Sequence, residues 1–190
     1  MPRTEEQFKD MREEKKALIM RVALELFAAN GYHGTTISSI ARKAGISQGL
    51  LYNYFDSKEE LIRTIIFSGL DIISGLLDPD NDSIVTQEEM EHFLGRFFDL
   101  LEDDLFYWRL YFSLFVQWPV ADLAQDRLTE FMESYINLLT SYFETRGCED
   151  PRTEALLFGA LLDGIGINYI SNPSFFPLEK MKNILLHKYT

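Results

Sequence analysis

Residues 36–55 read TISSIARKAGISQGLLYNYF. This stretch predicts two short helices, over 37–44 and 48–55, because the residue before each of them is a threonine or a serine that can cap it. Gly45 lies between the helices, where it can adopt the positive φ of a tight turn without a side-chain clash. Two short helices around such a turn are typical of a helix-turn-helix, whose second helix enters the major groove of DNA.

The second of these helices is expected to turn a hydrogen-bonding face outward, because Leu51 and Phe55 take the core side. None of the outward residues is acidic, and they comprise Ser47, Gln48, Gly49, Tyr52, Asn53 and Tyr54. Gln48 can read an adenine edge through two hydrogen bonds, and Lys58 adds a cation beside the phosphate strand. The alternative for Gln48 and Lys58 is an ordinary solvated surface.

The chain around this stretch, over residues 18–61, closely resembles the tetracycline-repressor family of bacterial regulators, above all in GYHGTTISSIA at 31–41 and AGISQGLLYNYFDSKEEL at 44–61. The resemblance implies a homodimer with two helix-turn-helix heads and a ligand-binding body. It also implies that seven residues occupy the usual DNA-contact positions of the family: Thr36, Ser47, Gln48, Gly49, Tyr52, Tyr54 and Lys58. Many members have lysine in place of Gln48, so the operator of this chain is expected to differ at that base step.

The remainder of the chain also reads as helix, because apolar residues recur at helical spacing and no window shows sustained alternation of apolar and polar residues. We expect an all-α fold of nine helices, in which a three-helix helix-turn-helix head precedes a helical body. The expected DNA-binding domain covers 1–57, and the expected ligand-binding and dimerisation domain covers 58–190. An aromatic helix is expected to end near Trp118-Pro119, and the next one to begin near Ala121.

Charge is spread unevenly along the 190 residues, which carry a net charge of −12. Taken alone, this value argues against a polyanionic partner. Residues 1–65 hold 10 basic and 9 acidic side chains, whereas the remaining residues hold 8 and 21. A nearly neutral head can bind DNA locally, while the acidic body limits non-specific association with it.

Export and membrane insertion are both disfavoured by the sequence. The charged N-terminus lacks the apolar run of a signal peptide, and the single cysteine, Cys148, forms no internal disulfide, so a reducing cytoplasm is expected. Residues 155–178 contain one charge, but Asp163 near their centre would cost about 3 kcal/mol in a bilayer. Pro173 also cuts this segment short, so we expect no membrane span.

Aromatic residues are concentrated in the second part of the chain, where seven of them lie within residues 106–118. Core packing is the simpler interpretation. The functional interpretation is an aromatic-lined cavity for a flat or hydrophobic effector, which could be cationic if an acid takes part. The residues expected to touch such a ligand are Phe97, Trp108, Tyr111, Phe112, Phe115, Tyr135 and Asp163.

A stripe of small and apolar residues marks one face of the helix expected over 151–172. It consists of Ala155, Gly159, Leu162 and Gly166, at spacings of four, three and four. Together with Met181, Ile184 and Leu185 of the last helix, this face is expected to form a four-helix dimer interface about a two-fold axis. In the family that the chain resembles, the last two helices form this interface.

One acidic stretch comes close to a calcium-binding loop. Asp78, Asp80, Asp82 and Glu89 occupy its positions one, three, five and twelve. However, Ser83 stands where the sharp turn needs glycine, and Glu89 is expected to form a capping box with Thr86. We therefore expect no metal and no cofactor. The three histidines are scattered, so no catalytic arrangement is indicated and an enzyme is not expected.

The sequence therefore favours a ligand-responsive transcriptional regulator. We expect a repressor that binds a palindromic operator as a homodimer and is released by a small hydrophobic ligand. One alternative is an activator, or a regulator controlled by a protein partner. The other is a helical ligand-binding protein without sequence-specific DNA binding.

Overall fold

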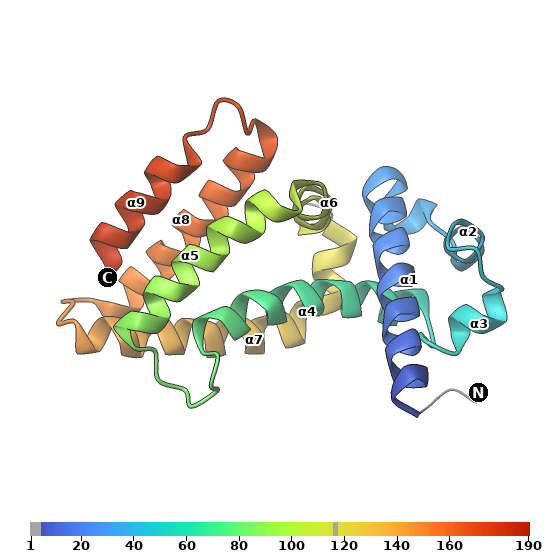
Figure 1. Cartoon of the computed structure of the whole chain (residues 1–190), viewed down its shortest axis with the longest axis horizontal. Helices are drawn as coiled ribbons and strands as arrows, with labels where there is room; N and C mark the ends of the chain where they lie inside the picture. Colours follow the sequence, from blue (N-terminus) through green and yellow to red (C-terminus); the bar gives the residue numbers. More distant parts are fainter. Residues whose placement is uncertain (1–4, 116–117) are drawn as a thin grey trace. The chain divides into compact units, whose positions relative to one another are not determined.

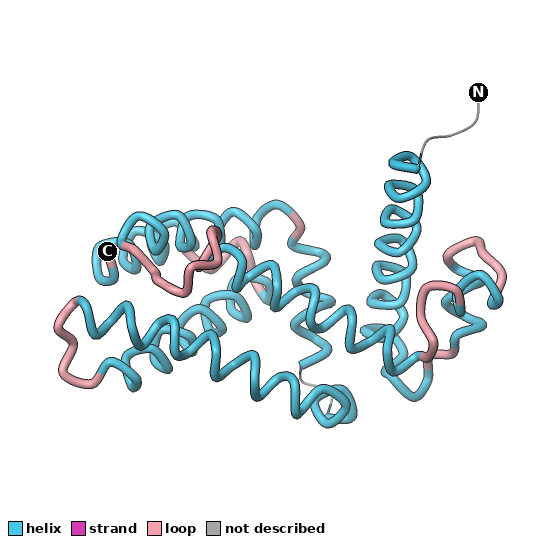
Figure 2. Tube along the Cα trace, turned by 90° about the horizontal axis from the view of Figure 1, so that it is seen from below, coloured by secondary structure: helices cyan, strands magenta, loops and turns pink. Residues whose placement is uncertain are grey.

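The structure is a computed structural model in which the backbone is described for residues 5–115 and 118–190, and side-chain surroundings for 6–114 and 128–190. Every regular element within these ranges is a helix, and short loops join the helices (Figures 1 and 2). The all-α prediction with nine helices is thereby confirmed. They are α1 (Glu5–Gly34), α2 (Ile37–Lys43), α3 (Gln48–Tyr52), α4 (Lys58–Leu77), α5 (Gln87–Asp103), α6 (Leu105–Phe115), α7 (Trp118–Thr145), α8 (Pro151–Ser171) and α9 (Leu178–Tyr189).

The largest differences between predicted and observed helix ends lie at the end of α3 and at the start of α7. Helix α3 ends at Tyr52, three residues before the predicted end at Phe55. Trp118 and Pro119, expected near the end of the aromatic helix, instead open α7. Proline is tolerated in a first turn because an N–H group there has no intrahelical acceptor.

The chain divides into two compact units. The first contains residues 1–68 and 110–123, and the second contains 69–109 and 124–190. Helices α4, α6 and α7 each contribute residues to both units. The functional boundary predicted after residue 57 stays a prediction. None of the helices described has the combination of length and apolar character that crossing a bilayer requires.

The first unit holds α2 and α3 against α1 through a small apolar core. Phe27, Ile40 and Leu51 are fully buried in it. Gly31 has a φ of 72°, which interrupts the helical backbone of α1 near its end. Gly45 has a φ of 67° in the turn between α2 and α3, as a tight helix-turn-helix requires.

Lys58 joins the start of α4 to the end of α1. Its Nζ donates hydrogen bonds to the carbonyl oxygens of Tyr32, at 2.8 Å, and Thr35, at 2.9 Å. The same ammonium lies 4.2 Å from the centre of the Tyr32 ring. Burial lowers the pKa of Lys58 from its ordinary value. This lysine therefore holds the start of α4 to two carbonyl groups, one in the last turn of α1 and one directly after it.

The second unit is organised around a cluster of aromatic rings from α5, α7, α8 and α9. The Phe158 ring lies 4.8 Å from that of Tyr189, 5.9 Å from that of Phe143 and 6.2 Å from that of Phe93, measured between centroids. The Tyr142 hydroxyl donates to the backbone oxygen of Tyr189 at 2.6 Å, which ties the last helix to α7.

Replacing Phe158 by alanine is expected to destabilise the second unit by about 3–5 kcal/mol, because the ring is fully buried among three others. The matched control is Phe175→Ala, since Phe175 is 82% exposed and its loss should change stability by less than about 0.5 kcal/mol. Urea denaturation followed by circular dichroism measures both. Equal midpoints for the two variants would contradict the packing described.

Replacing Lys58 by methionine is expected to destabilise the first unit by about 2 kcal/mol, because two charge-assisted hydrogen bonds are lost. Lys9→Met is the control, since Lys9 is exposed on α1 and its replacement removes the same charge. Thermal unfolding of the two variants in parallel provides the comparison. A Lys58 variant as stable as the Lys9 variant would show that the cation does not hold α1 to α4.

Candidate nucleic-acid interface and effector site

The two short helices of the first unit are capped as the sequence predicts. The Thr36 hydroxyl accepts a hydrogen bond from the Ser39 N–H at 3.1 Å, and the Ser39 hydroxyl accepts one from the Thr36 N–H at 3.1 Å. The Ser47 hydroxyl accepts the Leu50 N–H at 3.1 Å. Thr36 and Ser47 are both exposed, so each cap places its hydroxyl at the surface beside a helix N-terminus.

Four of the eight predicted DNA-contact residues lie on the outer face of α3 or directly after this helix. Gln48, Gly49, Tyr52 and Asn53 are all exposed, and Tyr52 keeps 49% of its surface accessible. A Cβ atom placed on Gly49 would meet no atom within 4 Å, so the backbone here is open to a close approach. This arrangement can present an amide, a phenol and bare backbone to a base edge or a phosphate.

Two predicted contact residues are partly engaged within the protein. Tyr54 is half-buried, and the Arg12 guanidinium lies 5.4 Å from its ring centre while donating to the Asn53 carbonyl at 3.4 Å. Lys58 uses two of its three donors on α1, so one N–H remains for a phosphate. Sequence reasoning missed this structural role, since a lysine at a helix start carries no signal of which carbonyls it will reach.

The residues predicted to touch an effector fall into both units. Phe97 and Trp108 are buried in the second unit. Tyr111 is buried in the first unit, where its hydroxyl donates to the Ile66 carbonyl at 2.6 Å. Phe112 is half-buried in the same unit, and the side chain of Phe115 lies outside the described residues.

Asp163 lies on the exposed side of α8. Neighbouring protein atoms still desolvate its carboxyl group in part and raise its pKa. Burial raises the pKa of Tyr135, and the negative charge of Asp163 raises it further.

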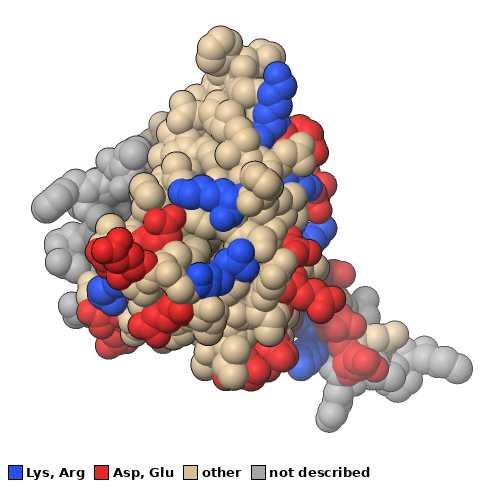
Figure 3. All heavy atoms as spheres, turned by 90° about the vertical axis from the view of Figure 1, so that its left-hand side faces the viewer, with Lys and Arg blue, Asp and Glu red and all other residues tan. Residues whose placement is uncertain are grey.

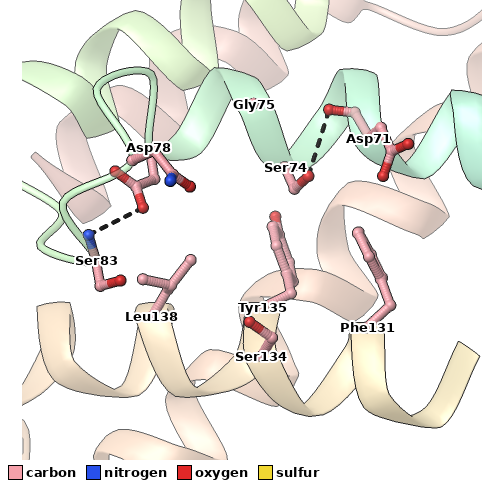
Figure 4. A pocket seen from close by; sticks show the side chains of 10 residues that line it. Asp71, Ser74, Gly75, Asp78, Ser83, Phe131, Ser134, Tyr135 and Leu138 are labelled. Carbon is pink, nitrogen blue, oxygen red and sulfur yellow. Dashed lines mark hydrogen bonds between the residues drawn. The ribbon is translucent and has the colours of Figure 1, made fainter. Parts of the chain in front are cut away.

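A pocket of about 260 Å³ opens between α4 and α7 in the second unit (Figure 4). Tyr135 is the predicted effector residue that lines it, whereas Phe97, Trp108, Tyr111, Phe112 and Asp163 do not. The lining residues are Asp71, Ser74, Gly75, Asp78, Asn81, Ser83, Phe131, Ser134, Tyr135 and Leu138. Sequence reasoning missed nine of these because the pocket forms only where two helices far apart in the chain face each other.

The stripe predicted for the dimer interface lies mainly inside the second unit. Four of its seven residues are buried there, namely Ala155, Leu162, Gly166 and Leu185. Gly159 and Met181 are half-buried, and Ile184 is 56% exposed. Small apolar residues can pack within a protein as well as against a partner. Helix α8 packs most of the residues of this stripe against its own chain. Its exposed apolar residues are Leu156, Leu157 and Ile167.

The acidic loop after α4 brings three carboxylates together, with oxygen atoms of Asp78, Asp80 and Asp82 within 4.8 Å of one another. Partial desolvation and repulsion from Asp82 raise the pKa of Asp80. Glu89 accepts the Thr86 N–H at 2.8 Å in the predicted capping box and is not one of these converging carboxylates. On the molecular face of Figure 3, Lys and Arg side chains lie among groups of Asp and Glu.

Comparison with known proteins relates the first unit to one family. Residues 19–65 match the family of bacterial regulatory proteins called the tetR family. The fatty acid metabolism regulator protein of Bacillus subtilis is 24% identical over 163 residues, which cover 85% of this chain and 78% of that protein. The transcriptional activator FasR of Mycolicibacterium smegmatis is 30% identical over 103 residues, which cover 54% of this chain and 47% of that protein.

Among solved structures, the fold is shared with the transcriptional regulator FadR of Bacillus subtilis in complex with stearoyl-CoA. The TM-score is 0.63 at 20% identity, and the match covers 90% of this chain and 95% of that one. These relatives are regulators and not enzymes. Residues 19–65 therefore match the tetR family of bacterial regulatory proteins, and the chain as a whole is similar to transcriptional regulators.

Proposed function

We propose that this protein is a homodimeric repressor that binds a palindromic operator and is released from it by a long-chain acyl-CoA. The observation that carries the DNA-binding part is the exposed outer face of α3, which has hydrogen-bonding groups and no acidic residue. An otherwise acidic chain would repel DNA, so a face free of carboxylates is where contact is electrostatically least opposed.

The DNA contacts divide into base reading and phosphate binding. Gln48, near the N-terminus of α3, is proposed to read a base edge, and Gly49 lets the backbone come close beside it. Tyr52, Tyr54 and Lys58 are proposed to bind phosphates. Because Lys58 already serves two carbonyl groups, its share in DNA affinity should be smaller than that of a free cation.

The dimer is proposed to form through the outer surfaces of α8 and α9. Leu156, Ile167 and Ile184 are each about half exposed there, which is costly for apolar side chains unless a partner covers them. Of the residues predicted for this interface, Gly159, Met181 and Ile184 are accessible enough to join it, while the buried ones hold the two helices together from within. A two-fold interface would pair each helix with its copy.

The effector class is proposed from the relatives. One is a fatty acid metabolism regulator, and a protein of the same fold is known in complex with stearoyl-CoA. To release DNA, the effector must bind the DNA-incompetent conformation more tightly than the competent one. Helix α4 is the proposed transmitter, because its residues are shared between the two units.

An activator is the second candidate, favoured by the 30% identity to the activator FasR. Mapping the operator against the promoter separates the two. An operator that overlaps the promoter supports repression, whereas one that lies upstream of it supports activation.

Selection from a random duplex library at physiological salt should yield a two-fold symmetric site. Gln48→Ala should relax the preference at one base step in each half by roughly 1–3 kcal/mol, because the bidentate contact is lost. The control is Gln87→Ala, an exposed glutamine at the start of α5 in the second unit. An unchanged sequence preference in the Gln48 variant would remove this residue from base reading, and an asymmetric site would contradict the dimer.

Stearoyl-CoA, titrated into the protein bound to its selected operator, should weaken DNA binding at least tenfold, which corresponds to about 1.4 kcal/mol of coupling. Fluorescence anisotropy of a labelled operator measures the change. Free coenzyme A and octanoyl-CoA serve as controls for the head group and for chain length. A change of less than twofold at saturation would contradict acyl-CoA release while leaving DNA binding intact.

A further inference from the structure

The pocket between α4 and α7 is built from one face of each helix. Its lining residues on the α4 side lie at positions 71, 74, 75 and 78, and those on α7 lie at 131, 134, 135 and 138. Both sets have the spacing of neighbours along a single helical face. At about 260 Å³ the space is slightly below the range of pockets that hold drug-sized molecules, so its shape suits a small, elongated ligand.

Tyr135 is the polar side chain from α7 that combines a buried ring with a hydroxyl open to this space. The residue is only 8% exposed, yet its hydroxyl group forms no hydrogen bond with any residue that the structure describes. Figure 4 shows this hydroxyl directed from α7 toward α4, into the pocket below Ser74. No buried side-chain nitrogen or oxygen of the described residues lacks a hydrogen-bond partner, so this hydroxyl is reached by solvent through the pocket, where a water or a polar ligand can bond to it.

Carboxylates mark the two ends of the pocket. Asp71 and Asp78 are seven residues apart, which places them about 10 Å apart along the axis of α4. Asp78 is held in place by the N–H groups of Asp82 and Ser83, each at 3.1 Å from its carboxylate. Among the described lining residues none is basic, and Asp80 and Asp82 lie close by. The pocket therefore attracts positive charge at both ends.

The wall between the carboxylates is apolar at its centre. The Phe131 and Tyr135 rings are stacked, with centroids 6.3 Å apart and planes 9° apart. Across from them, Gly75 leaves open space, since a Cβ atom added there would meet nothing within 4 Å. A methylene chain can lie along the two rings and past this glycine. The two carboxylates are too far apart to bind one metal ion together, since metal–oxygen distances are about 2–2.6 Å.

We propose that the α4–α7 pocket binds a linear aliphatic diamine, with one ammonium at Asp71, the other at Asp78 and the methylene stem against Phe131 and Tyr135. The Tyr135 hydroxyl accepts a hydrogen bond from the ammonium or from a water on it. This proposal does not depend on the proposed DNA contacts or on acyl-CoA binding. The negative charge of the pocket disfavours the phosphates of coenzyme A, so a test with a diamine is independent of those proposals.

Isothermal titration of the full-length protein with 1,8-diaminooctane tests the proposal. The diamine is expected to bind saturably with a Kd in the millimolar range or tighter, and more weakly as salt is added. Octylamine has one charge fewer and should bind more weakly than the diamine. Neutral 1,8-octanediol and dianionic suberate have similar length and should not bind. Equal binding of the diol or suberate, or no saturable binding of the diamine, would overturn the proposal.

Three variants place the binding in this pocket. Gly75→Leu should abolish binding by filling the open space, and it should not destabilise α4, since leucine is a better helix former than glycine. Asp71→Asn should weaken binding roughly threefold to tenfold, as expected for a partly exposed ion pair. Tyr135→Phe keeps the ring and should weaken binding through loss of the hydroxyl.

The control for these variants is Asp103→Asn, because Asp103 is exposed at the end of α5 and its replacement changes the net charge equally. Circular dichroism verifies that each variant is folded. If Gly75→Leu and Asp71→Asn bind the diamine as the Asp103 variant does, the site lies elsewhere and the proposal fails. If Gly75→Leu and Asp71→Asn weaken diamine binding while the Asp103 variant binds as the unmodified protein does, the proposal is supported.

Discussion

The hydrogen bonds from the Lys58 ammonium to the carbonyl groups of Tyr32 and Thr35 fix where α4 begins relative to the end of α1. Gly31 leaves helical geometry just before these carbonyl groups and interrupts the backbone of α1 near its end. Helix α4 then continues out of the first unit into the second. In the proposed regulator α4 is the transmitter, and this cation holds the first residue of that helix to the end of α1.

Much of the fold could be predicted from sequence because helix ends are set by local groups. The threonines of the two capping boxes and the glycines at positions 31 and 45 act within a few residues of themselves, and their roles can be inferred from neighbours in the chain. Pro119 is the exception: its sequence fits a helix end and a first turn equally well, and the structure places it in a first turn.

The candidate sites could be predicted only in part, for a reason that is also physical. Side chains on α3 could be sorted into inner and outer ones because the helix is short and Leu51 has only one core to enter. Helix α8 is apolar on most sides, so spacing alone could not show that Ala155 and Leu162 would pack inward. The α4–α7 pocket depends on the approach of two distant helices and on a missing side chain at Gly75, neither of which leaves a periodic signal.

Charge gives the two proposed ligands different places to bind. An acyl-CoA carries phosphates and a long apolar tail, whereas the α4–α7 pocket has carboxylates at both ends and a short apolar centre. Ligands of opposite charge would therefore not compete directly for this pocket, and each could bind while the other is present. If both bind, the protein would combine two chemical signals through one body.

The length of α4 sets how small an effector-induced movement can be. A helix of 20 residues is about 30 Å long. When such a helix pivots about one end by about 6°, the other end travels about 3 Å, which is roughly the length of a hydrogen bond. A rotation too small to disturb the packing at the pivot is thus enough to separate a donor from its acceptor at the far end, so α4 can act as a mechanical lever without any change in its own structure.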